Sequence, residues 1–182
     1  RAHPLALFVL AVASADAERM SEAEKKLDLI GEADGGAALP LARAIIALRR
    51  GEMEAARGFL GRAEMVEPSN SKVHVWKAEW HRAAKEADAA EECLKEAVRL
   101  APARSPERIA YATFLQTRGK RDQAVALLQT SVKDAPDFIA AWRMLANDAM
   151  AREDREAAAK ALNAIFAKVS LDFEAVMLQS KL

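Results

Sequence analysis

The chain has 182 residues, of which 52% are hydrophobic, 30% charged and only 5% aromatic, and its 27 basic side chains balance 27 acidic ones. Alanine is abundant whereas Val, Ile and Thr are sparse, which favours an all-helical protein over one that contains sheets. Because the charges balance, composition gives no electrostatic reason to expect a nucleic acid or an anionic membrane surface as partner. The length fits one domain or an array of small units.

The first expected helix lies in the most apolar run of the chain, "PLALFVLAVASA". This run is too short to cross a bilayer, so we interpret it as a buried helix and expect no direct membrane insertion by this segment. No basic start and cleavage site frame it as a signal peptide. Because the chain begins with Arg1 and not with methionine, we expect it to be processed or part of a longer protein. The compartment, cytoplasm or periplasm, therefore stays open.

Three prolines divide the rest of the chain into helical segments. Pro68, Pro102 and Pro136 follow one another at equal intervals. Proline lacks an amide hydrogen and restricts the residue before it, so each proline is expected to separate one helix from the next. Gly51 precedes Pro68 by the same interval by which Gly119 precedes Pro136, and each glycine supplies a turn there. The sequence therefore predicts pairs of helices that repeat with a constant period.

Four columns of residues repeat with the same period when the chain is counted in steps of 34 from Ala37. Alanine fills the eighth and twentieth places, where a methyl side chain lets the two helices of a pair approach closely. The positive N-terminal end of the second helix favours the acid at the eighteenth place. The leucine at the twenty-fourth place packs beside the contact between the two helices. In order of place, the columns are Ala44, Ala78, Ala112 and Ala146; Glu54, Asp88, Asp122 and Glu156; Ala56, Ala90, Ala124 and Ala158; Leu60, Leu94, Leu128 and Leu162.

This pattern resembles the tetratricopeptide repeat family, whose period is about 34 residues. The resemblance implies an all-α, right-handed superhelical solenoid of antiparallel helix pairs with about five repeats, which must stack because one pair cannot bury its apolar face alone. The repeats are expected at about 4–36, 37–70, 71–104, 105–138 and 139–172 of a single array over 1–182, and residues 173–182 begin a further or capping helix.

The fourth place departs from the family pattern. A large aromatic residue is expected there, but only Trp142 provides one, whereas Pro40, His74 and Arg108 occupy the place elsewhere. Individual repeats are therefore degenerate, and the limits of their helices stay open.

No motif predicts catalysis, a cofactor or a metal ion. His74 and His81 are seven residues apart, yet no carboxylate or thiol is placed with them as in a zinc-protease helix. Gly35 and Gly36 are not followed by the lysine and hydroxyl residue of a phosphate loop. Cys93 stands beside acids, which would raise the pKa of its thiol. We therefore predict a protein that is not an enzyme, without catalytic, cofactor-binding or metal-binding residues.

The expected binding surface comes from the resemblance. In tetratricopeptide arrays the first helix of every repeat lines a concave groove that takes up peptides or helices of partner proteins, chiefly through the second, fifth, ninth, twelfth and thirteenth places. The groove residues implied here are Phe8, Val12, Leu41, Ile45, Val75, Trp76, Glu79, Ile109, Thr113, Arg143 and Asn147. The last two, one turn apart, could hold a carboxylate or a backbone group. An alternative stays open, because apolar fifth-place residues also pack between adjacent first helices.

The expected function is a non-catalytic scaffold for protein–protein interaction, with a protein or peptide as partner and no nucleic acid. Alanine-rich, arginine-rich repeats of this style are similar to bacterial tetratricopeptide proteins of envelope, export or secretion assemblies. Two alternatives stay open. In the first, the chain is a structural spacer or self-association segment of a longer protein and forms a homo-oligomer in which residues 176–178 meet another copy. In the second, it is the docking arm of an enzyme whose catalytic domain lies elsewhere.

Overall fold

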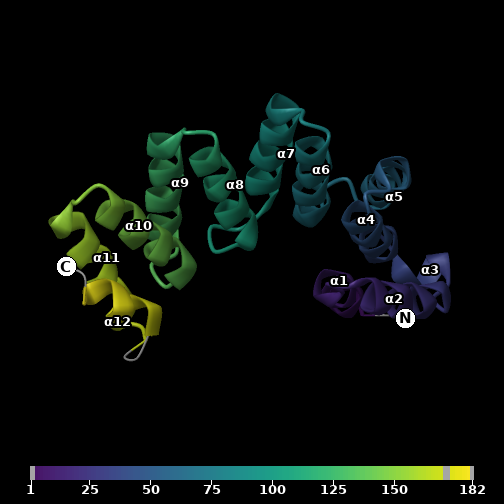
Figure 1. The fold of residues 1–182 in the computed structure, drawn as a ribbon, viewed down its shortest axis with the longest axis horizontal. Coiled ribbons are helices and arrows are strands. Elements are labelled where there is room, and N and C mark those ends of the chain that lie inside the picture. The colour runs from purple at the N-terminus through teal and green to yellow at the C-terminus, as the bar shows by residue number, and fades with distance from the viewer. Residues whose placement is uncertain (1–2, 170–172, 181–182) are drawn as a thin grey trace. The chain divides into compact units, whose positions relative to one another are not determined.

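The computed structural model describes residues 3–169 and 173–180, which form α-helices joined by turns (Figure 1), as the sequence predicted. Residues 170–172 and 181–182, which belong to the expected end of the fifth repeat and of the terminal helix, lie outside the described residues. The chain divides into two compact units, the N-terminal lobe Arg1–Leu100 and the C-terminal lobe Ala101–Leu182. That the two form one continuous array stays a prediction.

Helix pairs build the N-terminal lobe. α4 pairs with α5 and α6 with α7, and the first helix, α1, packs mainly on α4. The core of the lobe includes Leu27, Leu39, Ile45, Ile46 and Val73, none more than 2% exposed. The helices are α1 Pro4–Ala13, α2 Ala17–Asp28, α3 Glu32–Gly35, α4 Ala38–Arg50, α5 Met53–Val66, α6 Ser71–Ala83 and α7 Ala87–Leu100.

The C-terminal lobe repeats the arrangement. α8 pairs with α9 and α10 with α11, α9 packs on α10, and α12 packs on α10 and α11. Leu115, Leu128, Leu162 and Ile165 are at most 1% exposed in its core. The helices are α8 Pro106–Thr117, α9 Arg121–Asp134, α10 Ile139–Ala151, α11 Arg155–Phe166 and α12 Phe173–Gln179.

The alanine and leucine columns lie where the helices of each pair meet. All eight alanines of the eighth and twentieth places are at most 2% exposed, and the four leucines of the twenty-fourth place are at most 3% exposed. A side chain larger than a methyl group at these alanines would separate the two helices. The close approach predicted from the sequence is therefore confirmed in every pair from α4 to α11.

The turn inside each helix pair from α4 to α11 has one conformation. Gly51, Lys85, Gly119 and Glu153 all stand at the fifteenth place, with φ of 76°, 63°, 72° and 59°. In each turn the next amide bonds back to a carbonyl five residues earlier, as from Glu86 N to His81 O at 2.8 Å, the pattern of a Schellman cap. Lysine and glutamate hold a left-handed conformation that glycine adopts more readily. Only the two glycine turns were identified from the sequence.

A single hydrogen bond recurs at the fourth place, where the sequence departs from the family pattern. The side chains of His74, Arg108 and Trp142 each reach the carbonyl oxygen of the proline six residues earlier. The nitrogen–oxygen distances are 3.0 Å, 3.3 Å and 3.0 Å to Pro68, Pro102 and Pro136. A carbonyl oxygen only accepts, so Nε2 of the histidine carries the proton. Three unlike side chains thus make the same bond at the start of three first helices.

Arg49 fastens α1 to α4. Its guanidinium donates to the carbonyl oxygens of Ala11, Val12 and Ser14 at the end of α1, with Nη1 3.1 Å from the first and Nη2 2.7 Å from the second. The last carbonyls of a helix have no partner within it, and a cation also favours the negative end of the helix. One side chain of α4 therefore caps α1.

Candidate functional site

The predicted groove residues of α1 and α4 are mostly buried in the core of the N-terminal lobe. Leu41 is 2% exposed and Ile45 is fully buried, and both pack in the core with Leu7 of α1. Phe8 is half-buried against the same core, and only Val12, at 37%, is exposed. For Leu41 the structure agrees with the alternative that the fifth place packs between first helices. A partner reaching this face would meet Val12 and the edge of Phe8.

The three predicted residues of α6 are all half-buried. Trp76 packs on the core of the N-terminal lobe. Glu79 accepts hydrogen bonds from Nε and Nη2 of Arg82, one turn away, the first at 2.9 Å. Its charge is therefore paired on its own helix. Whether Val75, Trp76 or Glu79 contacts a partner stays a prediction.

The predicted residues of the C-terminal lobe are more open. Thr113 and Asn147, both at the ninth place, are exposed, whereas Ile109 and Arg143 at the fifth place are half-buried. Asn147 borders a hollow of about 460 Å³, which we call the first-helix hollow; its lining is Gln116, Gly119, Arg121, Asn147 and Asp148. Gln116 stands at the twelfth place, so the spacing that selected Asn147 could also have selected it.

A buried carboxylate forms one wall of the first-helix hollow. Asp148 is 6% exposed, with Oδ1 2.7 Å from Nε of Arg121 and Oδ2 2.9 Å from Nε of Arg152. Arg152 also donates from Nη2 to Oδ1 of Asp122 at 2.9 Å. The hydrogen bond to Asp122, reinforced by the charge of Asp148, raises the pKa of the Arg152 guanidinium above its ordinary value. The network pairs the buried charge and links the end of α10 to the start of α9.

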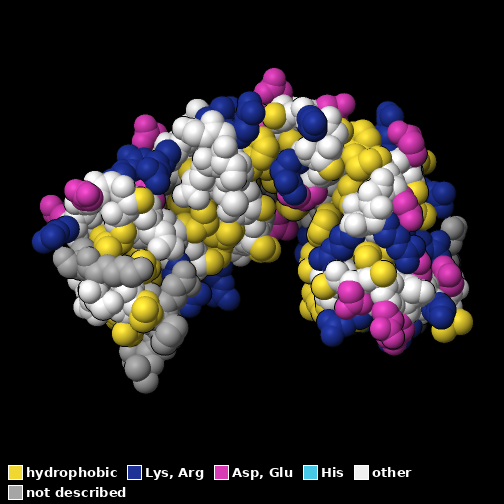
Figure 2. Space-filling model, viewed as in Figure 1, with side chains coloured by type: hydrophobic (Ala, Val, Ile, Leu, Met, Phe, Trp, Pro, Cys, Tyr) yellow, Lys and Arg dark blue, Asp and Glu magenta, His cyan; other side chains and the backbone are white. Residues whose placement is uncertain are grey.

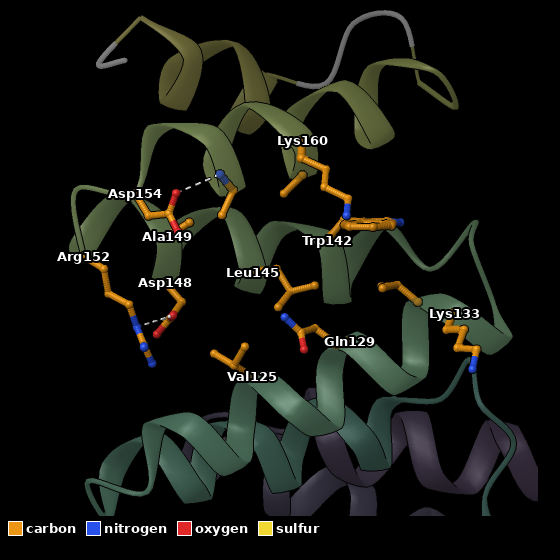
Figure 3. Close-up of a pocket in the computed structure, with 13 residues that line it drawn as sticks. Val125, Gln129, Lys133, Trp142, Leu145, Asp148, Ala149, Arg152, Asp154 and Lys160 are labelled. Carbon is orange, nitrogen blue, oxygen red and sulfur yellow. Dashed lines mark hydrogen bonds and ion pairs between the residues drawn. The ribbon is translucent and has the colours of Figure 1, made fainter.

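A larger cavity of about 680 Å³, whose lining also includes Asp148, lies where α9, α10 and α11 meet (Figure 3). We call it the second-helix cavity, since second helices of two successive repeats form its walls. Its lining is Val125, Gln129, Val132, Lys133, Trp142, Leu145, Asp148, Ala149, Arg152, Asp154, Ala157, Lys160 and Ala161. This cavity was not predicted from the sequence, because the binding positions implied by the family pattern all lie on the first helices.

Two observations on the described residues concern chemical reactivity. Residues 3–169 and 173–180 contain no group of three His, Cys, Asp or Glu side chains placed to hold a metal ion. Burial, with smaller contributions from Glu64 and Glu92, raises the pKa of the Cys93 thiol, although Lys77 opposes the effect. The raised pKa agrees with the sequence-based prediction, but its main cause is desolvation. A thiol in this state is a poor nucleophile.

The face drawn in Figure 2 carries both signs of charge, and no described helix could span a membrane. In this view, acidic and basic side chains both occur on each lobe. In the part of the chain that the structure describes, every helix is too short or too polar to span a membrane.

Solved structures with this arrangement of helices identify the fold. No protein-family model matches the sequence, and no curated protein matches it. YrrB, a tetratricopeptide protein with an unusual peptide-binding site, is 16% identical, with a TM-score of 0.60 over 93% of this chain and 88% of its own. PilF of Pseudomonas aeruginosa is 17% identical, with a TM-score of 0.67 over 96% of this chain and 80% of its own. The chain has the tetratricopeptide-repeat fold.

A third structure has the same fold. PilW, a type IV pilus biogenesis factor, is 15% identical, with a TM-score of 0.64 over 96% of this chain and 82% of its own. At such low identities the likeness concerns the fold alone. The binding sites of this tetratricopeptide-like chain must therefore be inferred from its own side chains.

Proposed function

We propose that the protein is a non-catalytic scaffold that binds a segment of a partner protein on the first-helix face of its C-terminal lobe. The observation that carries the proposal is the first-helix hollow, bordered by the ninth-place Asn147 and the twelfth-place Gln116. Thr113, the ninth-place residue of the preceding first helix, is exposed on the same lobe. The tetratricopeptide-like fold holds these side chains on rigid helices, which suits a binding surface.

The chemistry of the hollow fits an extended peptide. The carboxamides of Gln116 and Asn147 each provide donors and acceptors, which is what a peptide backbone requires. Arg121 adds a positive charge at the edge, although Asp148 already partners its Nε. A partner segment with polar backbone groups exposed would therefore be bound mainly by hydrogen bonds.

The test is affinity capture from a lysate of the source cell with three baits. The first is the unaltered protein and the second is Thr113→Glu/Asn147→Glu. The third, Thr130→Glu/Asn163→Glu, makes the same chemical changes at exposed positions of α9 and α11. Circular dichroism checks that all three are folded, and mass spectrometry quantifies the captured proteins.

We expect a partner that the first and third baits capture and the second loses. Equal capture by all three would contradict binding on the first-helix face. The finer proposal is that the partner belongs to a bacterial envelope, export or secretion assembly. Similarity to PilF and PilW supports it only through the fold, and the identity of the captured protein tests it directly.

Self-association is the second candidate, and exposed apolar residues at two helices favour it. Leu5 and Val9 of α1 are 57% and 53% exposed, and Val176 and Met177 of α12 are 42% and 48% exposed. Faces of this kind commonly mark contacts with further protein. If the chain is a spacer, its mass by light scattering should rise with concentration, and Leu5→Ser/Val176→Ser should abolish the rise. A constant monomer mass would reject this candidate.

A further inference from the structure

The second-helix cavity combines an apolar floor with a polar rim. α9 contributes Val125 and Val132 to the lining, and α10 contributes Trp142 and Leu145. We call these four side chains the apolar floor; Figure 3 labels three of them and shows the carboxamide of Gln129 beside Leu145. Its volume of about 680 Å³ lies within the range of roughly 300–1,000 Å³ in which proteins commonly bind ligands. Several side chains of a bound segment would therefore fit.

Three of the five charged side chains that line this cavity already have partners within the protein. Asp148 is held between two guanidinium groups, and Arg152 is shared between Asp148 and Asp122. Oδ1 of Asp154 accepts the amide hydrogen of Ala157 at 3.0 Å, as the cap of α11. These groups hold the walls together, so a ligand would have to compete with protein partners for them.

Two lysines differ from these paired groups. Lys133 of α9 and Lys160 of α11 both line the cavity and are exposed. Over the described residues, neither ammonium group takes part in a hydrogen bond or an ion pair of the protein. The cavity therefore presents two available positive charges around an apolar floor, and the complementary ligand is acidic at its edges and apolar at its centre.

We propose that the second-helix cavity is a second docking site, which receives a segment of a partner protein with an apolar side chain flanked by carboxylates. The apolar side chain would lie against Trp142 and Leu145, while the carboxylates would pair with Lys133 and Lys160. This inference rests on the proposed scaffold function but uses a separate cavity, whose lining shares only Asp148 with that of the first-helix hollow. One chain could then hold two partner segments at once.

The experiment is selection of binders from a random library of phage-displayed dodecapeptides on the immobilised full chain. Selected peptides are synthesised with a fluorescent label, and their dissociation constants are measured by anisotropy against four proteins. These are the unaltered chain, Lys133→Glu/Lys160→Glu, the first-helix variant Thr113→Glu/Asn147→Glu, and a matched control, Lys72→Glu/Lys168→Glu. The control makes the same charge change at exposed lysines that do not line the cavity.

The proposal predicts peptides rich in Asp, Glu and large apolar residues. Their dissociation constants should rise about tenfold or more in Lys133→Glu/Lys160→Glu, since two attractions become two repulsions. They should change less than twofold in the first-helix variant and in the control, and affinity should fall as salt is added. Circular dichroism confirms that the variants are folded.

Other outcomes separate this inference from the proposed function. Peptides that lose affinity only in Thr113→Glu/Asn147→Glu would support the first-helix site and overturn the second. Peptides that bind all four proteins equally, or a selection that yields none, would overturn the second site. In that case the lysate capture still decides the first. Binding that responds to Lys133→Glu/Lys160→Glu without any enrichment in acidic residues would refute the chemistry proposed for the ligand.

Discussion

The same places of the repeat have different environments in α4 of the N-terminal lobe and α8 of the C-terminal lobe. At the fifth and ninth places the N-terminal lobe has Leu41 and Ile45, which are at most 2% exposed. The C-terminal lobe has Ile109, which is half-buried, and Thr113, which is exposed. Within the N-terminal lobe α1 packs on α4 and closes this face. A place in the repeat therefore predicts the direction of a side chain, whereas its neighbours decide whether it is core or binding surface.

The largest expected difference in stability between the lobes is at the fifth place of the repeat. Leu41→Ala should lower the free energy of unfolding by about 2–5 kcal/mol, because it leaves a cavity in a closed core. Ile109→Ala, at the same place in the other lobe, should lower it by less than half as much. Tryptophan fluorescence during urea unfolding reports each lobe separately, since Trp76 and Trp80 lie in the N-terminal lobe and Trp142 in the other. A Trp142→Phe background isolates the N-terminal lobe, and Trp76→Phe/Trp80→Phe isolates the C-terminal one. Equal losses would contradict the difference between the lobes.

The next largest effect is expected on substitution of Arg49, which tests whether this side chain holds α1 against α4. Arg49→Ala removes three charge-assisted hydrogen bonds to the end of α1 and should destabilise the N-terminal lobe by about 1–3 kcal/mol. Arg49→Lys keeps the charge but cannot reach several carbonyls at once, so it should recover only part of the loss. Amide hydrogen exchange should accelerate first in α1. Unchanged exchange in α1 would show that packing alone holds this helix.

A smaller effect, an increase in stability, is expected on substitution to glycine at the fifteenth place in both lobes. Lys85→Gly and Glu153→Gly should each stabilise the protein by about 0.5–1 kcal/mol, because φ at both residues lies in the left-handed region. Gly51→Ala is the matched reverse change, and its new Cβ would meet no atom within 4 Å. Its cost should therefore come from φ alone and be of similar size. Urea midpoints measure all three, and destabilisation by Lys85→Gly would show that its side chain matters more than its backbone.

The smallest effect is expected where the C-terminal lobe is open. Thr113→Ala and Asn147→Ala should each change the free energy of unfolding by less than about 0.5 kcal/mol, since both side chains are exposed. The same variants should weaken capture of a partner if the first-helix face binds it. A larger loss of stability would mean that these residues are structural.

Composition predicted the all-α fold, and the constant period of the repeat predicted the buried alanine columns, because their burial depends on spacing along helices. The period did not show that Leu41 and Ile45 are core, since their burial depends on how α1 packs on α4. It also gave no indication of the second-helix cavity. Trp142, Lys133 and Lys160 are separate in the sequence, and only the packing of three helices brings them to one cavity.

The hydrogen bond at the fourth place explains how such repeats can diverge. His74, Arg108 and Trp142 have different shapes and charges, yet each satisfies the carbonyl of the proline that ends the preceding repeat. The position requires a donor of sufficient reach rather than a particular residue. Mutation can therefore exchange one side chain for another there without moving the boundary between repeats. The spacing of helices can outlast nearly all likeness of sequence, as the 15–17% identity to YrrB, PilF and PilW illustrates.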